Sequence, residues 1–331
     1  MGDRTGIEWT DATWNPVTGC TKVSQGCKNC YAERVFPRAY GGMRIPIYHE
    51  GELLSMRPRE FTDVQCHPER LDQPLRWKKP RRIFVNSMSD LFHESVPDEF
   101  IDQVFHVMGA CEWIKTGHVF QVLTKRPERM LKYMLERGHR AWNGKRPGGE
   151  VLYPPSNIHV GVSCEDQPTA DERTPLLLQT PAALRFVSLE PLLGAIDIEQ
   201  FLPVKCGCRS VAECFHNMTL CVDWVIVGGE SGAKARPMHP DWARSLRDQC
   251  VTAGVPFFFK QWGEWATTYD RDRDDPDWMT CTRAASSTPR GRWLNLVGGH
   301  GFHGDRVVRV VPVGKKAAGA TLDGREWREY P

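Results

Sequence analysis

The sequence has no apolar run long enough to cross a membrane, so a transmembrane helix is not expected. Its first six residues lack the apolar core of a signal peptide. It also has little excess charge, because 43 basic and 41 acidic side chains give a net charge of +2, which neither requires nor excludes a nucleic-acid partner. We therefore expect a cytoplasmic protein without membrane attachment, whose 12 cysteines serve as ligands, buried side chains or catalytic thiols rather than as disulfides.

Short apolar runs alternate with helical stretches along most of the chain. The runs are rich in β-branched and aromatic residues, which is typical of parallel strands covered on both faces. They lie at 82–87, 118–124, 157–163, 184–189, 223–228 and 256–260. Apolar periodicity and caps predict helices at 27–34, 98–110, 127–137, 170–178 and 240–253, the last with Gly254 as its C-cap. This repetition predicts an α/β fold, an open, partial parallel (β/α)6-type barrel.

The same pattern suggests a division of the chain. Residues 1–265 are expected to form the partial barrel, with the cysteine-bearing loop at 19–31. Residues 266–331 are expected to form a C-terminal extension. Three segments do not fit the repeat: an irregular insertion at 38–77, an exposed loop at 139–156 and a mobile loop at 269–292. A cysteine-rich insertion is expected at 203–222.

Three cysteines near the N-terminus, Cys20, Cys27 and Cys30, are the most specific chemical feature of the sequence. Three thiolates so close together suit an iron–sulfur cluster that keeps one iron free of protein ligands, and such an iron can bind a small molecule. The alternatives are a zinc site or buried thiols. Zinc sites favour two Cys-x2-Cys motifs, or one with a His pair, whereas only one motif and no His occur in this loop. The spacing therefore favours a cluster.

Polar side chains follow the predicted strands. In a parallel barrel the active site forms at the carboxyl ends of the strands. The candidates are Asn86, Ser87, Ser89, Asp90, Lys125, Ser163, Glu165, Glu190, Gly228, Gly229 and Glu230. Carboxylates and cations gathered there suit a zwitterionic or phosphate-bearing ligand, although salt-bridged surface residues would give the same pattern.

A second cysteine group lies between the fifth and sixth predicted strands. Its members are Cys206, Cys208, Cys214 and Cys221. Four sulfurs in so short a segment are compatible with zinc or an auxiliary cluster, but the spacing matches no standard zinc motif. Free thiols in a loop are the alternative.

Six stretches, spread almost from one end of the chain to the other, carry a family resemblance. They are Trp14–Lys22, Gly26–Glu33, Leu123–Pro127, Val225–Gly232, Phe257–Gly263 and Leu322–Trp327. In these stretches the chain resembles a radical S-adenosylmethionine (radical SAM) protein. More closely, it resembles a phage- and prophage-associated family of unknown function with a three-cysteine motif.

The resemblance implies a [4Fe-4S] cluster on Cys20, Cys27 and Cys30, with S-adenosylmethionine chelating the fourth iron. It also implies that Tyr31 is the aromatic residue beside the last cysteine. An external electron donor would reduce the cluster, and cleavage of S-adenosylmethionine would start radical chemistry on a substrate. Cys164 is then a candidate donor of a hydrogen atom to a product radical, with a small buried apolar residue as the alternative.

Two features depart from the superfamily pattern. The first gap between cysteines is six residues instead of three. The Gly-Gly-Glu that grips the amine of the cofactor follows the second strand in the superfamily, whereas here it is Gly228–Glu230 on the sixth. Asp90 or a serine hydroxyl after the second strand is one candidate for that grip. Glu230 is the other, unless it binds substrate.

A nucleobase or a nucleic acid is the predicted substrate class. The family's phage association favours it, and so do basic clusters at Lys78–Arg82, at the strand end Lys125–Arg126 and at Arg140–Arg146, the last of which includes Trp142. A solvated surface is the alternative for these clusters. Trp262 and Trp265 are candidates to stack on a base. The alternative functions are a metal-stabilised nucleic-acid-binding module without catalysis and a cluster-based redox protein.

Overall fold

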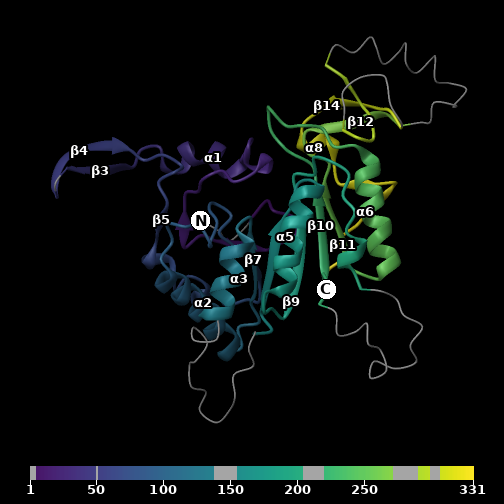
Figure 1. Cartoon of the computed structure of the whole chain (residues 1–331). Coiled ribbons are helices and arrows are strands. Elements are labelled where there is room, and N and C mark those ends of the chain that lie inside the picture. Colours follow the sequence, from purple (N-terminus) through teal and green to yellow (C-terminus); the bar gives the residue numbers. More distant parts are fainter. Residues whose placement is uncertain (1–4, 50, 138–154, 204–219, 271–289, 299–305) are drawn as a thin grey trace, which may run out of the picture. The chain divides into compact units, whose positions relative to one another are not determined.

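The computed structural model describes residues 5–49, 51–137, 155–203, 220–270, 290–298 and 306–331 (Figure 1). The chain forms two compact units. Unit 1 contains residues 1–161 and 180–184, and unit 2 contains residues 162–179 and 185–331. The predicted boundary at residue 265 stays a prediction, and most of the predicted mobile loop lies outside the described residues. In the described ranges no helix is both long and apolar enough to span a bilayer.

The main sheet has seven strands, in the order β1-β6-β7-β8-β9-β10-β11. Their bounds are Ala12–Trp14 (β1), Arg82–Val85 (β6), Val119–Thr124 (β7), Ile158–Ser163 (β8), Leu184–Leu189 (β9), Trp224–Gly228 (β10) and Phe257–Gln261 (β11). Strands lie beside one another in the order in which they occur along the chain, as in a (β/α) barrel, whereas a doubly wound sheet reverses its order. The expected α/β fold with a partial parallel barrel is confirmed.

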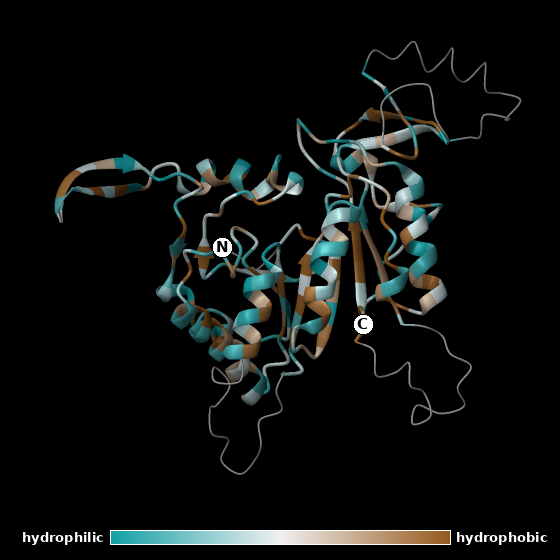
Figure 2. Cartoon of the chain, in the orientation of Figure 1, coloured by the Kyte–Doolittle hydropathy of each residue, from teal (hydrophilic) through white to brown (hydrophobic). Residues whose placement is uncertain are grey.

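The six predicted strands correspond to β6 through β11, and their residues explain why they are central. All five positions of β10 are buried, and its Val-Ile-Val run is coloured as hydrophobic in Figure 2. A continuous β-branched run of this kind fits a strand that is covered on both faces. The sequence analysis missed β1, which has only three residues and pairs in parallel with β6.

Helices follow most of these strands, with bounds near those predicted. They are α1 (Tyr31–Tyr40), α2 (Asp98–Trp113) and α3 (Pro127–Glu136) in unit 1, and α5 (Gln167–Gln179), α6 (Pro240–Ala253) and α8 (Lys315–Ala318) in unit 2. Proline occupies the first position of α3 and α6, where its missing N–H costs nothing. Gly254 ends α6 at a φ of 75°, which confirms the predicted C-cap. By contrast, α1 begins at Tyr31 rather than at Cys27.

The segment 38–77 was expected to be irregular, and this expectation is wrong. β3 (Arg44–His49) and β4 (Glu52–Pro58) form an antiparallel hairpin that extends away from the rest of unit 1 (Figure 1). Almost every hairpin position is exposed or half-buried, so no apolar face marks these strands in the sequence. Further along, β5 (Gln65–Cys66) pairs with β2 (Val17–Thr18), just before the first cysteine of the motif.

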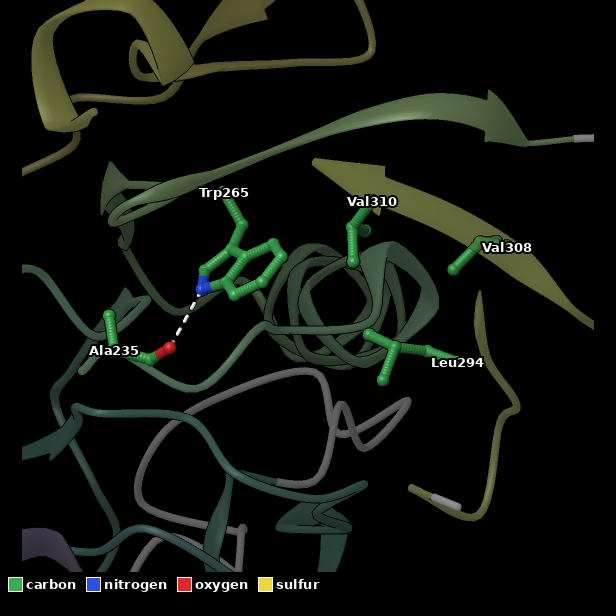
Figure 3. Packing of buried hydrophobic residues seen from close by; sticks show 5 residues of the cluster. All are labelled: Ala235, Trp265, Leu294, Val308 and Val310. Carbon is green, nitrogen blue, oxygen red and sulfur yellow. Dashed lines mark hydrogen bonds between the residues drawn. The ribbon is translucent and has the colours of Figure 1, made fainter. Parts of the chain in front are cut away.

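Unit 2 contains a second, antiparallel sheet, in the order β12-β14-β13. Its strands are β12 (Trp265–Asp270), β13 (Arg292–Leu294) and β14 (Val308–Pro312), followed by the short hairpin of β15 (Thr321–Leu322) and β16 (Arg325–Glu326). A small core of buried residues includes Trp265 (Figure 3). The indole N–H of Trp265 donates to the carbonyl oxygen of Ala235 over 2.8 Å. Trp265 is therefore a core residue, and the suggestion that it stacks on a base is wrong.

The N-cap of α6 gives unit 2 a pH-dependent stability. His239 is fully buried; its Nδ1 accepts from the Asp241 amide and its Nε2 donates to the Arg306 carbonyl over 2.7 Å. Burial lowers the pKa of His239, against the opposing effects of that carbonyl and of the Asp241 and Asp270 carboxylates, and with the help of the Arg306 charge. The unfolded chain therefore binds this proton more readily, and below pH 6.5 the free energy of unfolding falls by up to about 1.4 kcal/mol per pH unit.

We expect the His239→Asn variant to lose this part of the pH dependence, because asparagine is a good N-cap without a titrating group. Urea unfolding at pH 7, 6 and 5 measures it. The slope of the free energy of unfolding against pH should be smaller in the variant than in the unchanged chain. Parallel slopes would contradict the assignment to His239.

Candidate metal centre

The backbone around Cys20 is fixed by segments that are distant in sequence. The Gly19 amide donates to the Met88 carbonyl over 3.1 Å, and the Cys20 amide donates to the Phe61 carbonyl over 2.9 Å. Gly19 has a φ of 92°, and a Cβ there would lie 2.6 Å from the Asp63 carbonyl oxygen. Only glycine fits this position without a shift of the backbone. The loop that carries Cys20 is therefore held between the end of β6 and the segment before β5.

Cys27 and Cys30 are positioned by local structure. Cys27 ends a short 3-10 turn that starts at Gln25, and Cys30 is the residue before α1. Besides burial, the charge of Cys27 contributes to the raised pKa of Cys20 and of Cys30. Burial is the main cause that raises the pKa of Cys30, and burial together with Asp90 raises the pKa of Cys20 to about 11. All three thiols are free and half-buried.

This donor set fits a cluster better than a single ion. Within the described ranges, no three His, Cys, Asp or Glu side chains are arranged to hold one metal ion. A structural zinc site needs its ligands around one point, whereas the thiolates of a cluster bind different irons and need not converge. Each thiol would release its proton when it binds iron, so the raised pKa values oppose binding at low pH. Three thiolates would leave one iron of a [4Fe-4S] cluster without a protein ligand.

Arg126, which follows β7, contacts the cysteine loop directly. Its Nη1 donates to Cys20 Sγ over 3.6 Å, and its Nη2 donates to the carbonyl and the hydroxyl oxygen of Thr21 over 3.2 and 2.9 Å. The sequence analysis noted Arg126 only as part of a basic strand end. The signal that it belongs to the site, a contact across 106 positions, is absent from the local sequence.

The carboxylate of Asp90 is fully committed inside unit 1. Oδ1 accepts from the Phe92 amide and from the Thr124 hydroxyl, over 3.0 and 2.7 Å. Oδ2 accepts from the Lys125 amide and from Arg126 Nη1, over 3.0 and 3.4 Å. Asp90 therefore joins the ends of β6 and β7 and orients the arginine that contacts Cys20.

The other polar residues after β6 bind the N-terminal segment. The Ser87 hydroxyl donates to Asn15 Oδ1 over 3.2 Å, and the Ser89 hydroxyl donates to the Val17 carbonyl over 2.9 Å. Asn86, at a φ of 62°, accepts from the Val17 amide through Oδ1. Its Nδ2 is buried and has no hydrogen-bond partner among the residues that the structure describes. A buried amide donor of this kind is costly unless a ligand accepts its hydrogen bond.

Two further predicted residues belong to unit 1. Tyr31 follows Cys30 directly as the first residue of α1, and its side chain is 59% exposed. The positive charge of Lys125 lowers the pKa of Cys30, against the larger effect of burial, and the Lys125 amide donates to Asp90 Oδ2 over 3.0 Å.

In unit 2, the ends of three neighbouring strands carry an ion pair. Lys260 Nζ lies 2.6 Å from Glu190 Oε1, and both side chains are mostly buried. Gly228 leaves room for the pair, because a Cβ on it would lie 3.3 Å from Glu190 Cδ. Lys260 was not among the predicted site residues.

The Gly-Gly-Glu of β10 has a clear local role. Glu230 is buried and accepts from the Arg236 amide, from Nε and from Nη2, over 2.7, 2.9 and 2.6 Å. A Cβ on Gly229 would lie 2.1 Å from the Trp262 carbonyl oxygen. The two strand ends therefore approach so closely that glycine is required, and the carboxylate of Glu230 is engaged by a neighbouring arginine.

The residues after β8 are buried. The Ser163 hydroxyl donates to the Glu190 carbonyl over 3.1 Å. Glu165 is fully buried and lies 3.1 Å from Arg173 Nη1, and Cys164 is also fully buried. Of the second cysteine group, Cys206, Cys208 and Cys214 lie outside the described residues, and Cys221 is half-buried.

Comparison with known proteins gives one family match. The model of the family "Protein of unknown function (DUF5131)" matches residues 4–331. Among curated proteins there is no significant match.

Solved structures with weak similarity include three of spore photoproduct lyase. A cysteine-to-serine variant has a TM-score of 0.37 and 10% identity, and the match covers 87% of this chain and 77% of that one. A variant with bound AdoMet and dinucleoside spore photoproduct has a TM-score of 0.39 and 9% identity, with coverage of 85% and 75%. A complex with dinucleoside spore photoproduct has a TM-score of 0.37 and 10% identity, with coverage of 87% and 77%.

Proposed function

The chain belongs to the DUF5131 family, and from its own residues we propose that it is a radical SAM-like iron–sulfur enzyme. Cys20, Cys27 and Cys30 would hold a [4Fe-4S] cluster. The observation that supports the proposal is a buried arginine that donates to the sulfur of Cys20, the first of three free, half-buried thiols in one loop. When bound, the cluster and S-adenosylmethionine supply hydrogen-atom abstraction, after an external donor has given an electron.

In unit 1 some residues hold the structure of the site, and others are proposed to bind the cofactor. Asp90 orients Arg126 and the end of β7, so its carboxylate has no acceptor position left for the amine of S-adenosylmethionine. Asn86 Nδ2 is a buried donor without a partner in the described structure, and we assign it to an acceptor of the cofactor, such as its carboxylate. The exposed ring of Tyr31 would cover the cofactor beside Cys30.

In unit 2 we propose ligand binding for the Glu190–Lys260 pair, which offers both a carboxylate and a cation. Ser163 and Gly228 line the same strand ends and support Glu190 through its carbonyl and its side chain. Glu165 and Glu230 are positioning residues, because an arginine pairs with each. Cys164 stays a candidate hydrogen donor whose full burial favours the apolar alternative.

For the substrate we propose a nucleobase or a nucleic acid. Trp262, half-buried just beyond β11, is the described aromatic residue that supports it. The exposed Lys78 and Lys79 lie before β6, at the amino edge of the sheet, whereas Gly19, next to Cys20, bonds to Met88 beyond the carboxyl end of that strand. A phosphate backbone bound by these lysines would lie at the amino edge of the sheet and not beside the cysteine loop. The lysines are therefore not part of the proposal.

Anaerobic reconstitution of the full chain with iron and sulfide tests this function. After reduction by dithionite in the presence of S-adenosylmethionine, we expect 5′-deoxyadenosine, detected by chromatography. Added single-stranded or irradiated DNA should increase its yield if nucleic acid is the substrate. Binding of zinc alone, with salt-sensitive DNA binding and no cleavage, would favour the binding module instead. A stable cluster without any cleavage would favour the redox protein.

A further inference from the structure

Arg126 has more contacts with the cysteine loop than an anchoring role explains. It is 5% exposed, and its guanidinium group faces three oxygen-bearing residues and one sulfur. The two bonds to Thr21 would suffice to hold the loop. The bond from Nη1 to Cys20 Sγ, over 3.6 Å, brings a permanent positive charge to a ligand of the proposed cluster.

Two carboxylates balance this charge, at different depths. Asp90 is buried and lies 3.4 Å from Nη1, on the side of the guanidinium group that also contacts Cys20. Glu94 accepts from Nε over 2.9 Å, and its side chain is 67% exposed. Solvent weakens the effect of Glu94. Asp90 opposes the charge of Arg126 near Cys20, whereas the bond from Nη1 brings a hydrogen-bond donor directly to the sulfur.

We propose that Arg126 is a positioning residue that raises the reduction potential of the cluster, an inference that rests on the proposed function. A cluster that takes one electron from an external reductant becomes more negative, and no bond in the chain forms or breaks. Hydrogen bonds to the sulfurs and nearby positive charge stabilise that more negative state. Arg126 would then set part of the cost of reduction through its bond to Cys20.

The test uses the reconstituted full chain and measures the midpoint potential by a redox titration followed by electron paramagnetic resonance. For Arg126→Gln we expect a tenfold lower ratio of reduced to oxidised cluster at a fixed potential, which equals about 59 mV for one electron. The midpoint potential of Arg126→Lys should lie between those of the unchanged chain and of Arg126→Gln. Lysine keeps the charge but loses the planar guanidinium group that reaches Cys20 and Thr21 together.

Arg129→Gln is the matched control. Arg129 lies one turn further along and donates to the carbonyls of His93 and Val96 and to Asp98 Oδ1, so it holds the loop after β6 without a bond to Cys20. The Arg129→Gln variant should have the same midpoint potential as the unchanged chain. Iron and sulfide contents, measured on every variant, separate loss of the cluster from a shift in its potential.

Glu94→Gln keeps the inference open to test even if Arg126→Gln does not fold, because this side chain is mostly exposed. Removing a carboxylate that balances the cation should raise the ratio of reduced to oxidised cluster at a fixed potential, by about threefold. Equal potentials in the unchanged chain, Arg126→Lys and Glu94→Gln would overturn the inference and leave the proposed function standing. If the unchanged chain assembles no cluster, the proposed function fails, and the inference fails with it.

Discussion

Each of the variants Cys20→Ala, Cys27→Ala and Cys30→Ala is expected to lose 5′-deoxyadenosine formation and most of its bound iron. A three-thiolate site has no spare ligand, and within the described ranges no group of three His, Cys, Asp or Glu side chains is arranged to hold a metal ion in its place. In metal sites the loss of an outer-shell partner alone costs ten- to a hundredfold, so the loss of a ligand should exceed about a hundredfold. Iron content and product yield measure the effect.

Cys66→Ala is the control for these variants. Cys66 is also a free, half-buried thiol of unit 1, and burial likewise raises its pKa, but it lies on β5, opposite Val17. Its replacement should leave both the iron content and the product yield close to those of the unchanged chain. Equal losses in Cys66→Ala and Cys27→Ala would mean that alanine disrupts the unit in general, and the assignment of the ligands would fall.

The second large effect concerns the scaffold of unit 2. We expect Gly229→Ala to destabilise the chain by about 3 kcal/mol or more, because its Cβ would meet a backbone carbonyl that cannot rotate away. That contact is 2.1 Å to the Trp262 oxygen. In thermal unfolding followed by circular dichroism, the Tm should fall by about 6 °C or more.

The neighbouring Gly228→Ala variant is a sharp comparison. Its Cβ would lie 3.3 Å from Glu190 Cδ, and that side chain can shift by a few tenths of an ångström. We expect a loss of about 1 kcal/mol or less, with the effect falling on ligand binding by the Glu190–Lys260 pair. If the two alanine variants unfold at the same temperature, the close approach of the strand ends does not limit stability.

The strands of the sheet could be predicted where burial leaves a mark in the sequence. Runs such as Trp224–Gly228 consist of apolar residues only, so β10 stands out. Ala12–Trp14 is too short to show a run, although it pairs with β6 as regularly as β7 does. In the hairpin of β3 and β4 both faces are exposed, so the alternation that normally identifies a strand is missing.

The local sequence identifies the proposed ligands of the candidate site, but not the residues that support them. Cys27 and Cys30 lie within four residues, directly before α1, so their local spacing is visible in the sequence. Asp90 was assigned to the cofactor because a carboxylate at a strand end suggests a ligand. Its four hydrogen bonds come from residues that reach it through the fold, and no local pattern distinguishes a committed carboxylate from an available one.

The contacts that fix Cys20 also determine the stage of translation at which this residue can take up its position. Cys27 and Cys30 take up their positions once the first turn of α1 has formed. The backbone of Cys20 needs the carbonyls of Phe61 and Met88, and its sulfur needs Arg126, which leaves the ribosome 106 residues later. A nascent chain therefore presents two of its thiols early and the third only after β7 has joined the sheet. If the three thiols hold a cluster, its assembly would have to wait for the translation of more than a third of the protein.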